Sequence, residues 1–402
     1  MGTRTRIARY ALAAVVLLAS TLAGAVPAAA SPDRQTYLIG VDGAGPAGHN
    51  FEYVDYFPRG QVGDDGTPAV VGNGAILHFK YNFATLDGLH TATLLPPGET
   101  PAWAWANHPL VALDEPEPAP KPMLNPDVLF ARPAGCGASA SNPCTYTGAA
   151  EVNSGAMPGF AGGDYYVRIK LSERALEHRG EGQDGHQEGS TVRYVCLVHP
   201  GMQGSITVVD GRGSSPASFV RAAARQLKHD TAGALAAEAR ANHTLVTPNG
   251  DGTNTITMIA GTATPNVEIV EMLPRNVTIH PGDQVKWLTK TIKDPHTVTF
   301  PDTGSGPSLV EPLSPPWAAP PECEGTPDGA PNTCATPEIP INPAPNGVTV
   351  ISSPSTVATS GIIATFPPFA NSATFSFPNA GTFGYQCRIH DHMNGTITVA
   401  SS

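Results

Sequence analysis

The hydrophobic positions of this chain fall into short runs separated by turn-forming residues. In the first half, such runs occupy 36–40, 51–57 and 75–81, and Gly, Pro, Asn or Asp bounds each of them. Short apolar runs with these boundaries are typical of strands in a β-sandwich. Similar runs resume at 164–170 and continue on either side of Cys196. The first half is therefore predicted to be β-structure, without a convincing helix.

The second half repeats the pattern of the first. Residues 267–275 (VEIVEMLPR) match residues 51–59 (FEYVDYFPR), including the shared Pro-Arg, and a strand, a Pro-Gly turn and another strand follow at 277–287. Internal repetition on this scale indicates duplicated structural units. We expect an all-β protein with two tandem Greek-key β-sandwich domains, at 31–210 and 248–402.

A single helix is predicted between the two halves, within 211–247. Ser215-Pro216 forms a helix-start signal. Apolar residues then recur near helical spacing down to about Asn242, namely Val220, Ala224, Leu227 and Leu235. The apolar face is small and weak, which favours a helical linker packed on one domain over a helix that binds a partner.

The N-terminus has the pattern of a secretory signal. Three arginines precede an apolar run at 10–26, and Ala28-Ala29-Ala30 follows. A membrane anchor is the alternative, but the small residues favour cleavage after Ala30. No later apolar run is long enough to span a bilayer. We therefore expect residues 1–30 to be a signal peptide and the protein to be secreted or periplasmic.

The net negative charge of the chain disfavours some classes of binding partner. Loss of three arginines with residues 1–30 changes the formal charge from −11 to −14 and leaves 372 residues (402 minus 30). Nucleic acid and anionic membranes require a basic face, so both are disfavoured as partners. The acidity either keeps the protein soluble or steers it toward a basic redox partner.

Four of the six cysteines lie in two long insertions rich in Pro and Gly. One insertion runs from about 96 to 163 and contains Cys136 and Cys144; the other follows His296 and contains Cys323 and Cys334. An exported protein is free to form disulfides. We expect each pair to bond locally, although four cysteines allow two further pairings. Three tryptophans are expected to pack these insertions against the sandwiches, namely Trp103, Trp105 and Trp317.

Each of the remaining two cysteines is the first residue of a C-x2-H-x2-M motif that lies between two strand-like runs. The members of the two motifs are Cys196, His199 and Met202, and Cys387, His390 and Met393. A thiolate, two imidazoles and a weak axial thioether form the ligand set of a blue copper centre. Each loop supplies only one imidazole, so a second histidine must come from elsewhere. His90 and His296, each at the head of an alternating strand, are the candidates.

Both halves resemble the cupredoxins, the blue copper proteins of the plastocyanin and amicyanin kind. The resemblance covers the start and end of each half and implies one type 1 copper ion per domain. The implied ligands are His90, Cys196, His199 and Met202 in the first domain, and His296, Cys387, His390 and Met393 in the second. The alternatives are structural cysteines, ordinary turn histidines and core methionines.

Four protein ligands leave no open position for a substrate, whereas catalytic metals keep one. We therefore expect an electron-transfer protein with a redox partner protein, not an enzyme. A copper carrier or storage protein would use the same ligands. A two-domain oxidase or nitrite reductase resembles the chain less, because those families have a histidine directly before the ligand cysteine, where this chain has Val195 or Gln386. His392 is expected to face solvent near the copper.

Overall fold

The computed structural model describes residues 35–401 except for 44, 63–65, 82–88, 110, 114–121, 158–162, 177–188, 292, 305–346, 367–368 and 391. The predicted signal peptide, the predicted Cys323–Cys334 pair and Trp317 lie outside the described residues. Among the residues that are described, no helix is long and apolar enough to cross a membrane.

The first half folds into two five-stranded sheets. One has the order β3-β1-β5-β11-β9, built from Tyr56–Phe57, Thr36–Val41, Ile76–Tyr81, Asp164–Ile169 and Cys144–Tyr146. The other has the order β10-β6-β12-β13-β4, built from Val152–Asn153, Thr93–Leu94, Ser190–Val195, Gln203–Val209 and Val70–Gly72. Alternate side chains of the long strands point into a core of aromatic and branched residues between the sheets.

The second half forms a second sandwich. Its larger sheet has the order β16-β15-β18-β22-β20, built from Glu268–Leu273, Asn254–Ala263, Gln284–Leu288, Ser372–Ser376 and Val348–Val350, with β14 (Leu245–Pro248) on β15. Its other sheet has the order β17-β24-β23-β19-β21, built from Asn276–Ile279, Asn394–Val399, Gly381–Gln386, Thr299–Phe300 and Ala358–Thr359. Trp287 is fully buried between them. The prediction of two all-β sandwiches is confirmed.

One strand of the first half belongs to the sheet of the second. Strand β2 (Phe51–Glu52) pairs antiparallel with β16, so that Glu52 lies opposite Glu268 and Phe51 opposite Ile269. A separate apolar cluster surrounds this junction, with residues from β2, β3, β15, β16 and the long helix. The two sandwiches are therefore joined by a hydrogen-bonded strand pair and an apolar core, not only by a covalent linker.

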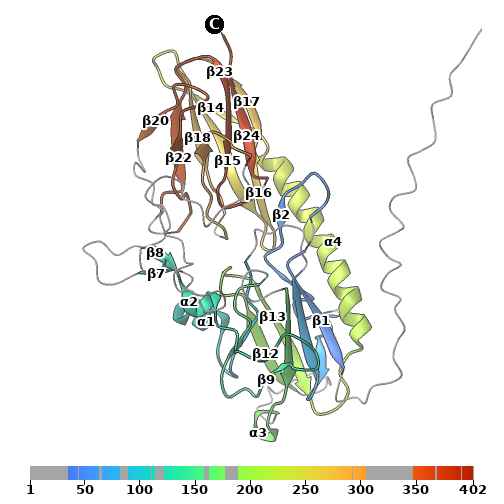
Figure 1. Cartoon of the computed structure of the whole chain (residues 1–402). Coiled ribbons are helices and arrows are strands. Elements are labelled where there is room, and N and C mark those ends of the chain that lie inside the picture. Colours follow the sequence, from blue (N-terminus) through green and yellow to red (C-terminus); the bar gives the residue numbers. More distant parts are fainter. Residues whose placement is uncertain are drawn as a thin grey trace, which may run out of the picture.

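Helix α4 (Pro216–Ala241) runs along the side of both sandwiches (Figure 1). Ser215 caps it as predicted, because its hydroxyl accepts from the N–H of Ser218. The predicted apolar face was wrong in part: Leu227 packs against the junction cluster, but Val220 and Leu235 are 47% and 36% exposed, whereas Phe219 and Ala234 are fully buried. The small alanines allow the helix to approach the sheets closely, and the ring of Phe219 packs at a tilt against that of Tyr37. The prediction that the helix packs on one domain was also wrong, because it contacts β1 and β3 as well as β15 and β16.

Polar contacts fix the helix at the junction. Asp230 of α4 accepts from the guanidinium of Arg59 at 3.0 Å and from the amide of Asn266 at 3.3 Å. These two partners come from different halves of the chain. The Nε2 of Gln226 donates to the carboxylate of Asp55 at 2.7 Å. Because the carboxylates of Asp55 and Asp230 are buried, this pairing offsets the desolvation of their charges and helps to fix the relative position of the two halves.

The first insertion contains local structure that the sequence did not predict. Short helices are present where no helix was expected, namely α1 (Pro101–Asn107) and α2 (Pro126–Leu129), and a β7-β8 hairpin joins Val111–Leu113 to Pro122–Leu124. A further short helix, α3 (Glu173–Leu176), follows β11, outside the insertion. The N-cap of Thr100 and the prolines at the first turns start α1 and α2. Helix α1 brings Trp103 and Trp105 against the sandwich.

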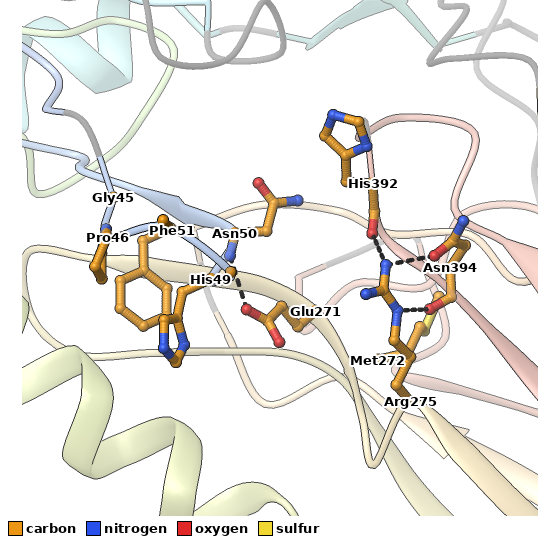
Figure 2. Close-up of a pocket in the computed structure, with 12 residues that line it drawn as sticks. Gly45, Pro46, His49, Asn50, Phe51, Glu271, Met272, Arg275, His392 and Asn394 are labelled. Atoms are coloured by element: carbon orange, nitrogen blue, oxygen red, sulfur yellow. Dashed lines mark hydrogen bonds between the residues drawn. The ribbon is translucent and has the colours of Figure 1, made fainter. Parts of the chain in front are cut away.

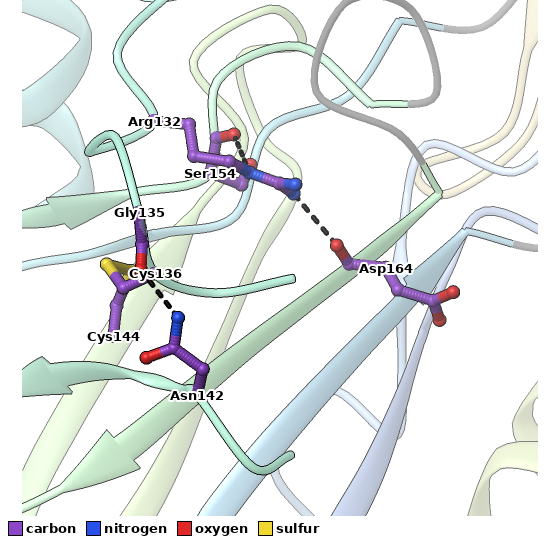
Figure 3. Close-up of a disulfide and its surroundings, with 7 residues drawn as sticks. All are labelled: Arg132, Gly135, Cys136, Asn142, Cys144, Ser154 and Asp164. Atoms are coloured by element: carbon purple, nitrogen blue, oxygen red, sulfur yellow. Dashed lines mark hydrogen bonds between the residues drawn. A yellow bond between two sulfur atoms is a disulfide. The ribbon is translucent and has the colours of Figure 1, made fainter. Parts of the chain in front are cut away.

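A disulfide between Cys136 and Cys144 closes part of this insertion, as predicted (Figure 3). Next to it, the guanidinium of Arg132 donates to the carbonyls of Ser154 and Asp164, both at 2.9 Å. The hydroxyl of Ser154 in turn accepts from the N–H of Ala92. The stapled loop is therefore connected to the strand that follows His90.

The buried face of α4 generates a stability prediction. Phe219 is fully buried and its ring centroid lies 4.8 Å from that of Tyr37. We expect Phe219→Ala to lower the free energy of unfolding by about 3–5 kcal/mol through the lost burial and the cavity left behind. The neighbouring Val220→Ala, on the exposed face, should change it by less than about 0.5 kcal/mol. Urea unfolding measures both, and equal effects would contradict the observed packing.

Candidate metal centres

The first centre begins with the hairpin loop between β12 and β13. The N–H of Cys196 donates to the carbonyl of Met202 at 3.0 Å, and the N–H of Met202 donates to the carbonyl of His199 at 3.1 Å. Gly201 supplies the left-handed turn, with φ of 100°. These bonds close the loop so tightly that the Nδ1 of His199 lies 3.7 Å from the sulfur of Cys196.

A threonine joins this loop to the segment that carries the second histidine. The N–H of Thr91 donates to the sulfur of Cys196 at 3.3 Å, although the two residues are 105 positions apart. Its hydroxyl accepts from the N–H of Leu197 at 2.8 Å. His90, the residue directly before Thr91, is held by paired backbone hydrogen bonds to Met157. The strand and the loop are therefore bonded to each other directly beside the cysteine.

His90, Cys196 and His199 converge as the sequence predicted. The Nδ1 of His90 lies 3.9 Å from the sulfur and 3.1 Å from the Nδ1 of His199, and none of the three residues is more than 3% exposed. Two imidazole nitrogens and a sulfur thus surround one buried point that is shielded from solvent. This donor set fits copper or another soft metal ion, because thiolate and imidazole are the ligands such ions prefer.

The second centre repeats the first. The Nδ1 of His390 lies 3.6 Å from the sulfur of Cys387 and 3.2 Å from the Nδ1 of His296. Thr297 occupies the place of Thr91: its N–H donates to the sulfur at 3.4 Å, and its hydroxyl accepts from the N–H of Arg388 at 2.8 Å. The duplication detected in the sequence therefore extends to individual hydrogen bonds.

Met202 and Met393 are buried at the ends of their loops, each with its carbonyl bonded to the N–H of the cysteine. Their position beside the two Cys/His groups agrees with the predicted motif. Their role as axial ligands stays a prediction, as does the role of the other six residues in binding metal.

The protonation of both centres suits metal binding. Burial raises the pKa of Cys196, but hydrogen bonds and charge from His199 and His90 outweigh it and lower the pKa to about 5. The pKa of Cys387 is likewise lowered well below its ordinary value, because His296 and His390 outweigh its burial. The thiolate is the form that binds metals. A bound ion would replace the protons that the histidines share with it.

Three buried carboxylates that the sequence analysis missed approach the far nitrogens of these histidines. The Oε1 of Glu52 lies 3.3 Å from the Nε2 of His90, and the Oε1 of Glu268 lies 3.4 Å from the Nε2 of His296. Both glutamates occupy matching positions in the repeated segments 51–59 and 267–275. That match was the available signal. Carboxylates in such positions orient metal-binding imidazoles and raise their basicity.

The third carboxylate contacts a histidine of the other half. The Oδ1 of Asp294, in the second half, lies 3.0 Å from the Nε2 of His199 in the first. No sequence signal marked this contact, because the corresponding position in the first half is Gly88.

His392 is exposed, as expected, and lies beside a cavity of about 390 Å³ (Figure 2). The loop 45–51 of the first half and the ends of β16 and β24 line this cavity. Arg275 holds the backbone there, because its guanidinium donates to the carbonyls of His392 and Asn394 at 2.8 and 2.9 Å. Trp105 approaches the other loop, with its indole N–H donating to the carbonyl of Cys196 at 2.8 Å.

No known family profile and no curated protein matches the chain. Among solved structures, a Cu(I) form of an amicyanin mutant is similar to 40% of this chain and 93% of its own, with 12% identity and a TM-score of 0.20. Amicyanin from Paracoccus versutus (Thiobacillus versutus) matches 40% of this chain and 92% of its own, with 13% identity and a TM-score of 0.19. The function proposed below rests on the geometry of this chain.

A glycine in β15 generates a prediction about the second centre. Gly261 lies at a bulge with φ of 74°, and a Cβ placed there would be 1.9 Å from the Nε2 of His296. We expect Gly261→Ala to displace this histidine and lose the metal ion of the second centre alone. Backbone strain at this φ should add about 1–3 kcal/mol of destabilisation.

The matched control is Gly233→Ala, in the middle of α4, where a Cβ meets open space. This variant should keep both metal ions and gain up to about 1 kcal/mol in stability from its higher helix propensity. Metal content per chain and thermal unfolding measure both variants. Full metal content in Gly261→Ala would contradict the contact with His296.

Proposed function

We propose that this protein is an exported electron-transfer protein that holds one type 1 copper ion in each half. The observation that carries the proposal is the duplicated, solvent-free Cys/His/His group, with a buried methionine next to it. Each group would hold copper through the thiolate and the two Nδ1 atoms, with Met202 or Met393 as the weak axial ligand. Copper in such a site exchanges single electrons between Cu(I) and Cu(II).

The burial of the donors favours electron transfer over catalysis. None of the six cysteine and histidine residues is more than 4% exposed, so a substrate has no approach to the metal. Catalytic metal sites keep an open position for a substrate or a water molecule. The residues directly before the cysteines, Val195 and Gln386, are not metal ligands of the kind that enzymes of this class require.

The same burial favours electron transfer over copper carriage. The hydrogen bonds of Thr91 and Thr297 close each centre around its cysteine, so release of copper requires the strand and the loop to separate. An electron needs no such opening. The partner in this proposal is a redox protein that exchanges single electrons.

Export agrees with two features of the chain. The N-terminal pattern has the form of a cleavable signal, and the Cys136–Cys144 disulfide persists in oxidising compartments outside the cytoplasm. The acidic balance of the chain would direct it toward a basic redox partner through long-range attraction.

Replacement of each cysteine tests the proposal. The copper-loaded protein should contain two copper ions per chain and show an intense visible charge-transfer band with type 1 electron paramagnetic resonance signals. We expect Cys196→Ser and Cys387→Ser each to remove one copper ion and its share of the band, because each removes one thiolate. Metal analysis and both spectra measure the result.

The control is a double variant, Cys136→Ser with Cys144→Ser, which removes two cysteines without touching either centre. It should keep both copper ions and the band, while losing roughly 2–4 kcal/mol of stability with the disulfide. Absence of the band from the loaded wild type would refute the proposal, as would turnover of nitrite or a phenol with a type 2 copper signal.

A further inference from the structure

The first centre faces the second half of the protein. In the structure, the ring of His199 is 3% exposed, and its Nε2 is covered by the carboxylate of Asp294 at 3.0 Å. Asp294 is itself 5% exposed. The imidazole edge of the first centre is therefore in contact with the second half and not with solvent.

Asp294 is also close in sequence to a histidine of the second centre. It lies two residues before His296, whose Nδ1 is 3.2 Å from that of His390. One hydrogen bond and the backbone from Asp294 to His296 thus join an imidazole of one centre to an imidazole of the other. Because electron tunnelling weakens steeply with distance and with gaps through space, a short bonded connection of this kind favours direct exchange.

The junction that holds this contact is packed and hydrogen-bonded between the halves. Strand β2 pairs with β16, the apolar cluster fills the space around them, and Asp230 bridges Arg59 and Asn266 from the two halves. A buried apolar core and paired charges resist domain movement. The separation of His199 and Asp294 is therefore set by the fold and does not depend on a docking event.

We propose that Asp294 couples the two copper centres, so that an electron passes directly between them through the hydrogen bond from His199. This inference rests on the function proposed above. In the exchange, one centre is oxidised from Cu(I) to Cu(II) and the other is reduced from Cu(II) to Cu(I), with no transfer of atoms. The protein then stores up to two electrons, and either copper centre can be reduced by an electron that enters at the other.

The contact has a second effect that is measurable at one centre alone. A carboxylate that accepts the Nε2–H of a metal-bound imidazole makes the imidazole a stronger donor, which stabilises the more positive Cu(II). In a Cys387→Ser background, only the first centre retains copper. Asp294→Ala there should weaken Cu(II) binding in the first centre by about 10–100-fold, although Asp294 belongs to the second half.

Controls separate this effect from a general loss of structure. Asp294→Asn keeps a carbonyl oxygen as acceptor and should restore most of the affinity. Asp302→Ala removes another acid of the second half, on the far side of His296 in the chain, and should leave the first centre unchanged. If Asp294→Ala fails to fold, Asp294→Leu fills the same space without an acceptor and replaces it in the series.

Electron exchange is tested in the protein that carries both copper ions. A pulse of reductant that delivers less than one electron per chain should be followed by a redistribution whose rate is independent of protein concentration. Both single-centre variants, Cys196→Ser and Cys387→Ser, should lack this phase and provide the reference spectra. Asp294→Ala should slow the phase at least about tenfold, equal to about 1.4 kcal/mol in the activation barrier, and Asp294→Asn should largely preserve it.

Three results would overturn the inference while leaving the proposed function intact. The first is a protein with two blue copper ions and no concentration-independent phase. The second is an unchanged rate and an unchanged first centre in Asp294→Ala. The third is an additional metal ion that Asp294→Ala releases, because the donor atoms of Glu52, His199 and Asp294 lie within 4.8 Å of one another and such an ion would replace the hydrogen bond. Failure to bind copper at all would refute the proposed function instead.

Discussion

The hydrogen bonds of one threonine in each half hold the candidate centres together. Thr91 and Thr297 follow the upstream histidines and bond both to the cysteine sulfur and to the N–H of the next residue in the loop. Each threonine therefore sets the distance between a strand and a loop that are far apart in the chain. The local loop presents a thiolate and one imidazole, and the threonine ties to that loop the strand that carries the second imidazole.

The junction between the halves contains several buried charged residues. Asp42, Glu52, Glu268 and Asp294 are each no more than 5% exposed, and Lys293 is 8% exposed. Burying charge is expensive unless it is paired. Burial raises the pKa of Asp42 and of Glu268 to about 7, which lessens their charge near neutral pH. The imidazoles of His90, His296 and His199 face Glu52, Glu268 and Asp294 and offset part of their charge.

The duplicated fold explains how the two centres come to face each other. The repeated segments 51–59 and 267–275 provide matching strands that pair with each other, so Glu52 and Glu268 lie opposite one another while each contacts a histidine of its own half. Helix α4 then packs along both sandwiches. The asymmetric element is the contact of Asp294 with His199, because the position two residues before the upstream histidine is Asp294 in the second half and Gly88 in the first.

The sequence by itself determined the two β-sandwiches, the local disulfide and the residues that converge at each centre. These follow from local information: strand-length apolar runs, the spacing within C-x2-H-x2-M, and the repeat that pointed to His90 and His296. Only the tertiary structure decided the buried face of α4, the pairing of β2 with β16, and the contacts of Glu52, Glu268 and Asp294 with the imidazoles. The contacts of Glu52 and Glu268 lie within each half, where the repeat marked matching positions but gave no distance to an imidazole. The other features depend on which surfaces of the two halves meet, and spacing along one chain gives no signal for packing across the junction.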